Sequence, residues 1–372
     1  MARDVYFTGS IPLSPAAEVF QVVGEHVGAF APRIPDGEQG GWIQVARRTL
    51  ANNPSLEEGH RIKRSGDDAV GVPTYHLKPG FTAKDLTLGP YGYGKNALDS
   101  YEQFKRIRSD HHLAAGTRFQ FTIPGPGTST YNVGIPAEQL LPISAAALWR
   151  EIEEVLPLIP AEDLCCQLDI GMEAEHEEYR RRPEVFDTPN HQFFDWTTEQ
   201  IADSIASVVN RIPSEVEVGF HICSIWHHFQ GGGQDNNVLV DTANALAERL
   251  TRPLGYVHIP VIPEHKEEDY AVFSNLRLPT ETKLYLGVIN LSDGVAGAKH
   301  RLEMAERHVN VDGVAFFCGL GGAAQARNTT PFAPPEYPPL HSTDQLKNPQ
   351  LKRATPDTIG AVLDLHRKIA EL

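Results

Sequence analysis

Three side chains that can bind a soft metal ion stand at the ends of two predicted strands. His221 and Cys223 occur in the run VEVGFHICS, and Cys318 occurs in DGVAFFCGLGG. Strand residues two positions apart project from the same face, so the His-x-Cys pair presents a nitrogen and a sulfur together. A cysteine from a second strand end would complete three ligands for Zn²⁺ and leave an open position, as in catalytic zinc sites. The alternative is structural, because cysteine is among the most buried residue types.

The composition is that of an ordinary globular protein. The chain has 372 residues, of which 41% are hydrophobic and 22% charged, and this suffices for one α/β barrel. The formal net charge of -15 argues against nucleic-acid partners, which require clustered Lys and Arg. No stretch approaches a membrane span, and residues 1–10 lack the features of a secretory signal. Four cysteines without disulfide-like spacing agree with a reducing compartment, so we expect a cytoplasmic location.

Short β-rich runs alternate with helical patterns along the chain. The predicted strands are Val5–Thr8, Ala31–Ile34, Arg118–Ile123, Cys165–Ile170, Val216–His221, Tyr256–Ile259, Leu284–Val288 and Gly313–Phe317. The predicted helices include Ser144–Leu156, Thr198–Arg211, Val238–Leu250, Ala296–His308 and Pro356–Ala370. Eight strands separated by helix-length connections predict a (β/α)8 TIM barrel, and we expect a single domain over residues 1–372.

Two connections are longer than a plain crossover requires. Asp36–Thr117 is a long insertion after the second strand, with a helix predicted around Ala97–Arg108. Asn328–Pro349 is rich in Pro and Thr. Long loops on barrels serve as lids or as contacts in a homo-oligomer. The alternative for the second connection is a wrap that covers the barrel.

Polar residues stand at nearly every predicted strand end. Barrels of this type carry their chemistry at the C-terminal ends of the strands, so these residues predict an active site. In chain order the ends supply Ser10, Glu38, Asp169, His221 with Cys223, His258, Asp293 and Cys318. The alternative for the carboxylates is helix capping or hydrogen bonding at the barrel rim.

Seven short motifs occur in an order that resembles the catalytic barrel of cobalamin-independent methionine synthase. They are GSIP, PDGE, the Pro-Gly-Pro after the third strand, QLDIGMEAE, HIC, LGVIN and CGLGG, and they span most of the chain. That family belongs to a superfamily with uroporphyrinogen decarboxylase and the epoxyalkane:coenzyme M transferases. The resemblance implies that His221, Cys223 and Cys318 bind zinc. It also implies that three further residues hold the amino-acid part of a thiol substrate, namely Ser10, Glu38 and Asp169.

The implied activity is transfer of a methyl or other alkyl group from a small-molecule donor to a thiol. Zinc bound by thiolates stabilises a substrate thiolate at neutral pH, and this nucleophile attacks an alkyl carbon. Homocysteine or another small thiol would be the acceptor. Trp42 and Tyr93, from the insertion after the second strand, would cover the donor.

The sequence departs from this family at two chemically important positions. Pro260 stands where the family has another zinc-binding glutamate, with His258 and Glu264 as the nearest replacements. Ser292 stands where the family has the histidine that protonates the leaving folate nitrogen, and Asp293 could act as an acid only if burial raised its pKa. We therefore expect a donor with a better leaving group than folate, such as a sulfonium, a methylcorrinoid or an epoxide. His258 and Asp293 are the predicted catalytic residues.

Two other functions remain open on the sequence. A metal-free lyase or decarboxylase would use the same strand ends, with four histidines as acid or base candidates: His221, His227, His228 and His258. A non-catalytic thiol or metal binder would explain the missing glutamate and the missing histidine. Metal analysis separates the first alternative from the transferase, and a search for turnover separates the second.

Overall fold

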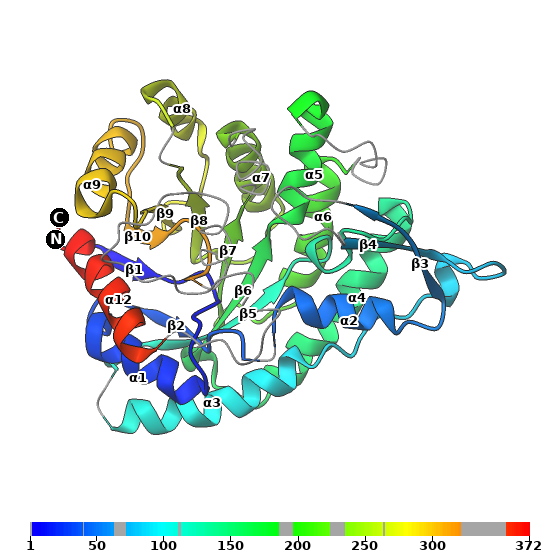
Figure 1. The fold of residues 1–372 in the computed structure, drawn as a ribbon, viewed down its shortest axis with the longest axis horizontal. Coiled ribbons are helices and arrows are strands. Elements are labelled where there is room, and N and C mark those ends of the chain that lie inside the picture. Colours follow the sequence, from blue (N-terminus) through cyan, green and yellow to red (C-terminus); the bar gives the residue numbers. More distant parts are fainter. Residues whose placement is uncertain are drawn as a thin grey trace.

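Eight parallel strands form a nearly closed barrel with helices around it (Figure 1). The computed structural model describes residues 2–39, 41–62, 72–110, 113–185, 196–223, 235–262, 265–320 and 355–372. The strand order is β1-β10-β9-β8-β7-β6-β5-β2. The bounds are β1 Asp4–Tyr6, β2 Arg33–Pro35, β5 Arg118–Pro124, β6 Leu164–Ile170, β7 Glu217–Ile222, β8 Tyr256–Pro260, β9 Lys283–Ile289 and β10 Gly313–Phe316. These confirm the predicted (β/α)8 barrel and all eight of its strands.

The helices that cover the barrel bury their apolar faces against the strands. They are α1 Ala16–Val27, α4 Ala137–Val155, α5 Met172–Arg181, α6 Thr198–Val209, α7 Asn236–Arg249, α8 Glu267–Ala271, α9 Gly294–Ala305 and α12 Pro356–Ala370. The prediction that one helix begins at Ser144 is wrong, because α4 begins at Ala137 and continues through Pro142. Burial of Leu140 and Leu141 in the core stabilises this first part of α4 against the cost of an internal proline.

The insertion after β2 contains a hairpin that the sequence analysis did not predict. The insertion comprises α2 Ile43–Ala51, β3 Leu56–Ile62, β4 Val72–Leu77 and α3 Tyr93–Ser109. The antiparallel hairpin of β3 and β4 projects from the barrel at the right of Figure 1. Backbone hydrogen bonds from Tyr75 to Asn132 (2.9 Å) and from Gly134 to Tyr75 (2.8 Å) attach it to the segment after β5. The predicted helix around Ala97–Arg108 is confirmed as part of α3.

β1 and β2 lie at the two ends of the strand order and form no ladder with each other within the described residues. We call this junction the seam. Side chains from β5 and β6 hydrogen-bond to the carbonyl groups that follow β1. Gln120 donates to Phe7 O at 2.8 Å, and Gln167 donates to Thr8 O at 2.5 Å. The two glutamines also bond to each other, at 2.8 Å. The seam is therefore held by polar side chains inside the barrel.

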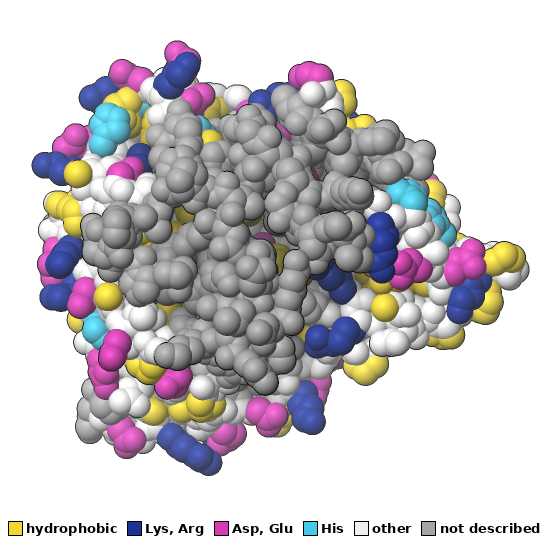
Figure 2. All heavy atoms as spheres, in the orientation of Figure 1, with side chains coloured by type: hydrophobic (Ala, Val, Ile, Leu, Met, Phe, Trp, Pro, Cys, Tyr) yellow, Lys and Arg dark blue, Asp and Glu magenta, His cyan; other side chains and the backbone are white. Residues whose placement is uncertain are grey.

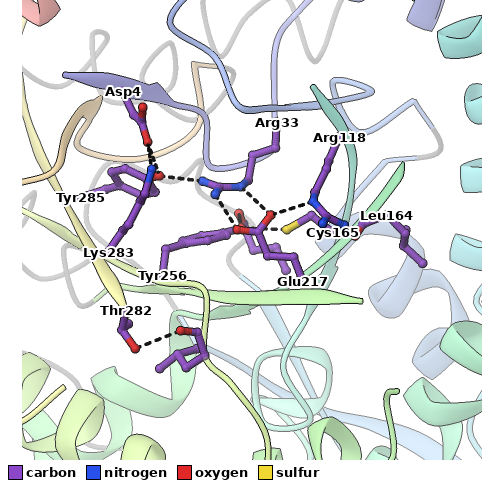
Figure 3. Close-up of polar contacts among 12 residues, drawn as sticks. Asp4, Arg33, Arg118, Leu164, Cys165, Glu217, Tyr256, Thr282, Lys283 and Tyr285 are labelled. Carbon is purple, nitrogen blue, oxygen red and sulfur yellow. Dashed lines mark hydrogen bonds and ion pairs between the residues drawn. The ribbon is translucent and has the colours of Figure 1, made fainter. Parts of the chain in front are cut away.

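An ion-pair network fills the N-terminal end of the barrel (Figure 3). Arg33 on β2 contacts Glu217 on β7, with Nη2 2.6 Å from Oε1, and donates to Tyr285 Oη on β9 at 2.9 Å. Tyr285 in turn donates to Asp4 on β1 at 2.8 Å. The guanidinium carbon of Arg33 also lies 4.3 Å from the centre of the Tyr256 ring. This network links β2 across the barrel to β7, β9 and β1.

Charged side chains of both signs are interspersed around the described rim of the face drawn in Figure 2. In the described part of the chain, no helix is both long and apolar enough to cross a membrane.

Beside the barrel, α12 packs against α1, and the backbone N–H of Arg3 donates to Ala370 O at 2.8 Å (Figure 1).

We predict that Glu217→Ala destabilises the protein by on the order of 3 kcal/mol, because the buried Arg33 guanidinium loses its carboxylate partner. Chemical denaturation followed by circular dichroism measures this change. Glu248→Ala is the matched control, since its ion pair with Arg277 (2.9 Å) is solvent-exposed. The control should cost less than about 1 kcal/mol. Equal losses of stability in the two variants would contradict the role given to Arg33 and Glu217.

Candidate metal centre and substrate pocket

The three predicted metal ligands lie together at the C-terminal end of the barrel. One ligand atom from each of His221, Cys223 and Cys318 lies within 4.8 Å of the others. His221 is on β7, Cys223 follows that strand directly, and Cys318 follows β10. The backbone N–H of Cys223 donates to Ile170 O at 3.0 Å, which continues the parallel pairing of β6 and β7 to the edge of the site. The structure therefore brings the three side chains together, and their role as metal ligands stays a prediction.

The register of β6, β7 and β8 places three polar residues side by side at the same height in the barrel. Asp169 on β6 is paired with His221 on β7, which is paired with His258 on β8. All three side chains are buried. His221 Nδ1 lies 2.6 Å from His258 Nδ1, so the two imidazoles share one hydrogen bond. His258 therefore contacts His221 directly, and it is not part of the three-residue group that could hold a metal among the described residues.

In the absence of a metal, the pKa values of Cys318 and His221 are shifted in opposite directions. A hydrogen bond from Cys223, together with the nearby imidazole of His221, holds the pKa of Cys318 well below that of an ordinary thiol. Burial alone would lower the pKa of His221, but the negative charges of Asp169 and Cys318 outweigh it and raise that pKa. The sulfur of Cys318 and the imidazole of His221 thus stabilise each other's charged form.

The donor set fits a zinc ion. His221 Nε2 is buried and has no hydrogen-bond partner among the described residues, whereas Nδ1 is occupied by His258. A buried nitrogen without a partner is costly unless it meets a ligand. One imidazole and two sulfurs form a ligand set typical of zinc, and three protein ligands leave a position for substrate.

Two carboxyl groups, Asp169 and Glu38, complete the polar side of the site. Burial raises the pKa of Asp169 to about 7, although the positive charge of His221 opposes the shift. Burial also raises the pKa of Glu38 well above its usual value, and the nearby charges of Asp169, Asp36 and Cys318 add to it. A ligand with positive charge would relieve this clustering of carboxylates.

The backbone of Glu38 adopts an unusual conformation at the site. Its φ of 60° lies in the left-handed region, which a residue other than glycine adopts at an energetic cost. Its N–H donates to Asp36 Oδ1 at 2.8 Å, which helps to hold this turn. Across the seam, a Cβ added at Gly9 would lie 2.6 Å from Glu38 Oε1, so only glycine permits the carboxyl group to approach the end of β1. Gly9 thereby brings Glu38 close to Ser10.

A small pocket extends from Glu38 toward α2 and α3. Its lining combines two acidic residues with aromatic and amide side chains, including Asp36, Glu38, Trp42, Tyr93, Asn96 and Gln120. Trp42 and Tyr93 are held together, since the Tyr93 hydroxyl donates to Trp42 O at 3.0 Å. On the other side of the seam, Leu320 N–H donates to Ser10 O at 2.8 Å, which ties the segment after Cys318 to the end of β1. The substrate roles of Ser10, Glu38, Asp169 and Trp42 stay predictions.

Asp293 makes contacts that give it a structural role. Both of its carboxylate oxygens accept hydrogen bonds from Arg301, at 2.7 and 2.8 Å. Arg301, on α9, also donates to Val288 O on β9 at 2.8 Å, so Asp293 supports the side chain that joins this helix to the strand. The neighbouring Ser292 hydroxyl donates to Asn290 Oδ1 at 2.7 Å. The catalytic assignment of Asp293 stays a prediction, and the alternative candidates Glu264, His227 and His228 lie outside the described residues.

The sequence analysis overlooked two acidic residues, Asp36 and Glu173. Asp36 lines the pocket and accepts a hydrogen bond from Ser100 at 2.8 Å. Glu173, at the start of α5, is buried, accepts from Gly127 N at 2.8 Å and also binds the Thr128 hydroxyl. Asp36 is part of the motif PDGE, and Glu173 is part of QLDIGMEAE. Their positions within these motifs were the signal that could have identified them.

Comparisons with known proteins show the fold. No family model matches the chain, and no curated protein does. A putative vitamin-B12-independent methionine synthase from Listeria monocytogenes is similar in structure, with a TM-score of 0.51 and 17% identity over 88% of this chain and 96% of that one. A B12-independent methionine synthase from Shewanella sp. W3-18-1, in complex with selenomethionine, has a TM-score of 0.54 and 12% identity over 88% and 95% of the two chains. At these identities, the chain shares with those proteins a (β/α)8 barrel.

Proposed function

We propose that this protein is a zinc-dependent transferase that moves a methyl or other alkyl group from a small-molecule donor to a thiol. The observation that carries the proposal is the approach of His221, Cys223 and Cys318 to within 4.8 Å at the C-terminal end of the barrel. The two similar structures support the choice of reaction class, and one of them is in complex with selenomethionine, an alkylated amino-acid selenol. A homocysteine-like thiol is therefore the proposed acceptor.

Zinc at this centre would hold the acceptor thiol as a thiolate at neutral pH. The residues of the chain orient and enclose the acceptor. Glu38 and Asp169 would bind its ammonium group, and that positive charge would lower the pKa of both carboxyl groups toward ordinary values. Burial of His221 and Cys223 excludes water from the inner side of the site. Ser10, tied to the segment after Cys318, would contact the amino-acid part of the acceptor.

The donor would enter from the pocket lined by Trp42 and Tyr93. Ser292 occupies the position that the resemblance assigns to a proton donor, and its hydroxyl is already engaged with Asn290. A serine hydroxyl has no readily released proton near neutral pH. We therefore propose a donor whose leaving group departs without protonation, such as a sulfonium or a methylcorrinoid.

A metal-free lyase or decarboxylase is the second candidate, and one observation favours it. The pKa of Asp169, about 7, would suit a general acid or base near neutral pH. Such an enzyme would bind no zinc, so metal analysis separates the two candidates.

The first prediction is that protein purified without chelators carries close to one zinc ion per chain and that Cys223→Ser loses most of it. The substitution removes a charged, soft ligand. Elemental analysis of the purified proteins measures the metal. Cys166→Ser is the matched control, because Cys166 is buried in the main hydrophobic core and is not one of the three candidate ligands, so it should not affect zinc content. Full zinc content in Cys223→Ser would contradict the site.

The second prediction concerns the binding of the acceptor's ammonium group by Glu38. Glu38→Gln should weaken binding of an amino-acid thiol by roughly 1.5–3 kcal/mol, the range for a hydrogen bond to a charged group. Isothermal titration calorimetry measures the affinity. A thiol of similar size without an ammonium group is the control, and the two proteins should bind it equally. Equal affinity for the amino-acid thiol would exclude Glu38 from the acceptor site.

The third prediction concerns the donor. Zinc-loaded protein should show no substantial methyl transfer from methyltetrahydrofolate to homocysteine, because no proton donor replaces the family histidine at Ser292. Mass spectrometry of the thioether product measures turnover, with a methylsulfonium compound as the comparison donor. Turnover with the folate at about 1 per second or faster, a rate typical of enzymes, would show that the expectation from Ser292 is wrong.

A further inference from the structure

The short contact between His221 and His258 constrains the protons of both rings. Their Nδ1 atoms are 2.6 Å apart. A hydrogen bond between two imidazoles requires that one Nδ1 carries a proton and the other offers a lone pair. Both side chains are fully buried, so water does not compete for either atom. One ring must therefore be the donor and the other the acceptor.

The surroundings of His258 favour its role as the acceptor. If His221 Nε2 offers its lone pair to a metal ion, the proton of that neutral ring is on Nδ1, and His258 Nδ1 is then the acceptor of the shared hydrogen bond. On the other side of the His258 ring, Nε2 makes no hydrogen bond within the described residues, and the Phe316 carbonyl lies near it. A Cβ added at Gly287 would lie 3.0 Å from both His258 Nε2 and Phe316 O, which places the two atoms around the same gap. With its proton on Nε2, a neutral His258 offers a lone pair at Nδ1.

The His258 ring is also held in place. Its centre lies 4.9 Å from that of Tyr6, and the Tyr6 hydroxyl donates to Gln167 in the polar interior of the barrel. His258 therefore sits on a fixed aromatic surface beneath His221. Such a ring can maintain one orientation of its neighbour, as the outer partners of metal-bound histidines do.

We propose that His258 is a positioning residue that accepts the Nδ1 proton of His221 and leaves His221 Nε2 as the atom that faces the metal. This inference rests on the metal site proposed above. His221 Nε2 is the nitrogen that lacks a hydrogen-bond partner among the described residues, which agrees with its assignment as the ligand atom. Strand β10 lies beside both groups, since the Phe316 carbonyl borders the same gap as His258 Nε2 and Cys318 follows two residues later.

Two substitutions of His258 test the proposal by metal affinity. His258→Phe keeps a ring against Tyr6 but removes the acceptor, and it should weaken Zn²⁺ and Co²⁺ binding by roughly 10–100-fold, the usual effect of losing such a partner. His258→Asn places an amide oxygen near the former position of Nδ1 and should restore most of the affinity. Competition with a chromophoric chelator measures both. Wild-type affinity in His258→Phe, or equal losses in the two variants, would overturn the proposal.

His366→Phe is the matched control for the loss of a buried imidazole. His366 is fully buried in α12, its Nδ1 contacts Val362 O at 2.8 Å, and it is not one of the three residues that could hold a metal. This variant should bind metal as the wild type does. An affinity loss equal to that of His258→Phe would indicate a general packing effect and would overturn the proposal.

The tautomers provide a readout that does not require metal. In metal-free wild-type protein labelled with ¹⁵N-histidine, NMR should find a proton on His258 Nε2 and a proton on His221 Nδ1. A proton on His258 Nδ1 would overturn the proposal. A wild-type protein that binds no metal would instead overturn the proposed function, and the tautomers would still decide whether His258 orients His221.

Discussion

The barrel depends on hydrogen bonds from interior side chains, because strand pairing does not close the seam between β1 and β2. Gln120 and Gln167 donate to the carbonyl groups that follow β1. At the opposite end of the barrel, the guanidinium group of Arg33 binds Glu217. An unpaired buried polar group costs free energy, so these contacts must form together when the barrel closes. The interior of this barrel is correspondingly more polar than a purely aliphatic core.

The candidate metal centre is built above this polar interior from one stretch of continuous sheet. Strands β7, β8, β9, β10 and β1 follow one another in hydrogen-bonded order, and they position His221, Cys223, Cys318 and Ser10. Asp169 joins them from β6, which pairs with β7 on its other side. Burial raises the pKa of Asp169, whereas a hydrogen bond from Cys223 and the nearby His221 imidazole lower that of Cys318. These polar groups therefore share one buried region at the end of the barrel.

Features that depend on the local periodicity of the sequence could be predicted. Features that depend on contacts between residues far apart in the sequence could not. The barrel strands were recognisable as short buried runs, and His221 and Cys223 share a face because they are two residues apart. β3 was not predicted, since LEEGHRI lacks a regular apolar alternation. The arrangement of His258 depends on the separation of two Nδ1 atoms, and the pairing of Asp293 depends on Arg301 two helical turns away. Neither has a signature in local sequence.

The seam divides the proposed site into a stiff part and a compliant part. The metal ligands and Ser10 belong to strands joined by continuous backbone ladders, whereas Glu38 follows β2, the strand at the far end of the order. Glu38 faces Gly9 across the seam without a backbone ladder between their strands. A small change in the width of the seam would therefore alter the spacing between Glu38 and Ser10 while leaving the separation of the three metal ligands unchanged. Under the proposed function, such a change would let the site take acceptors of different length without moving the three candidate metal ligands.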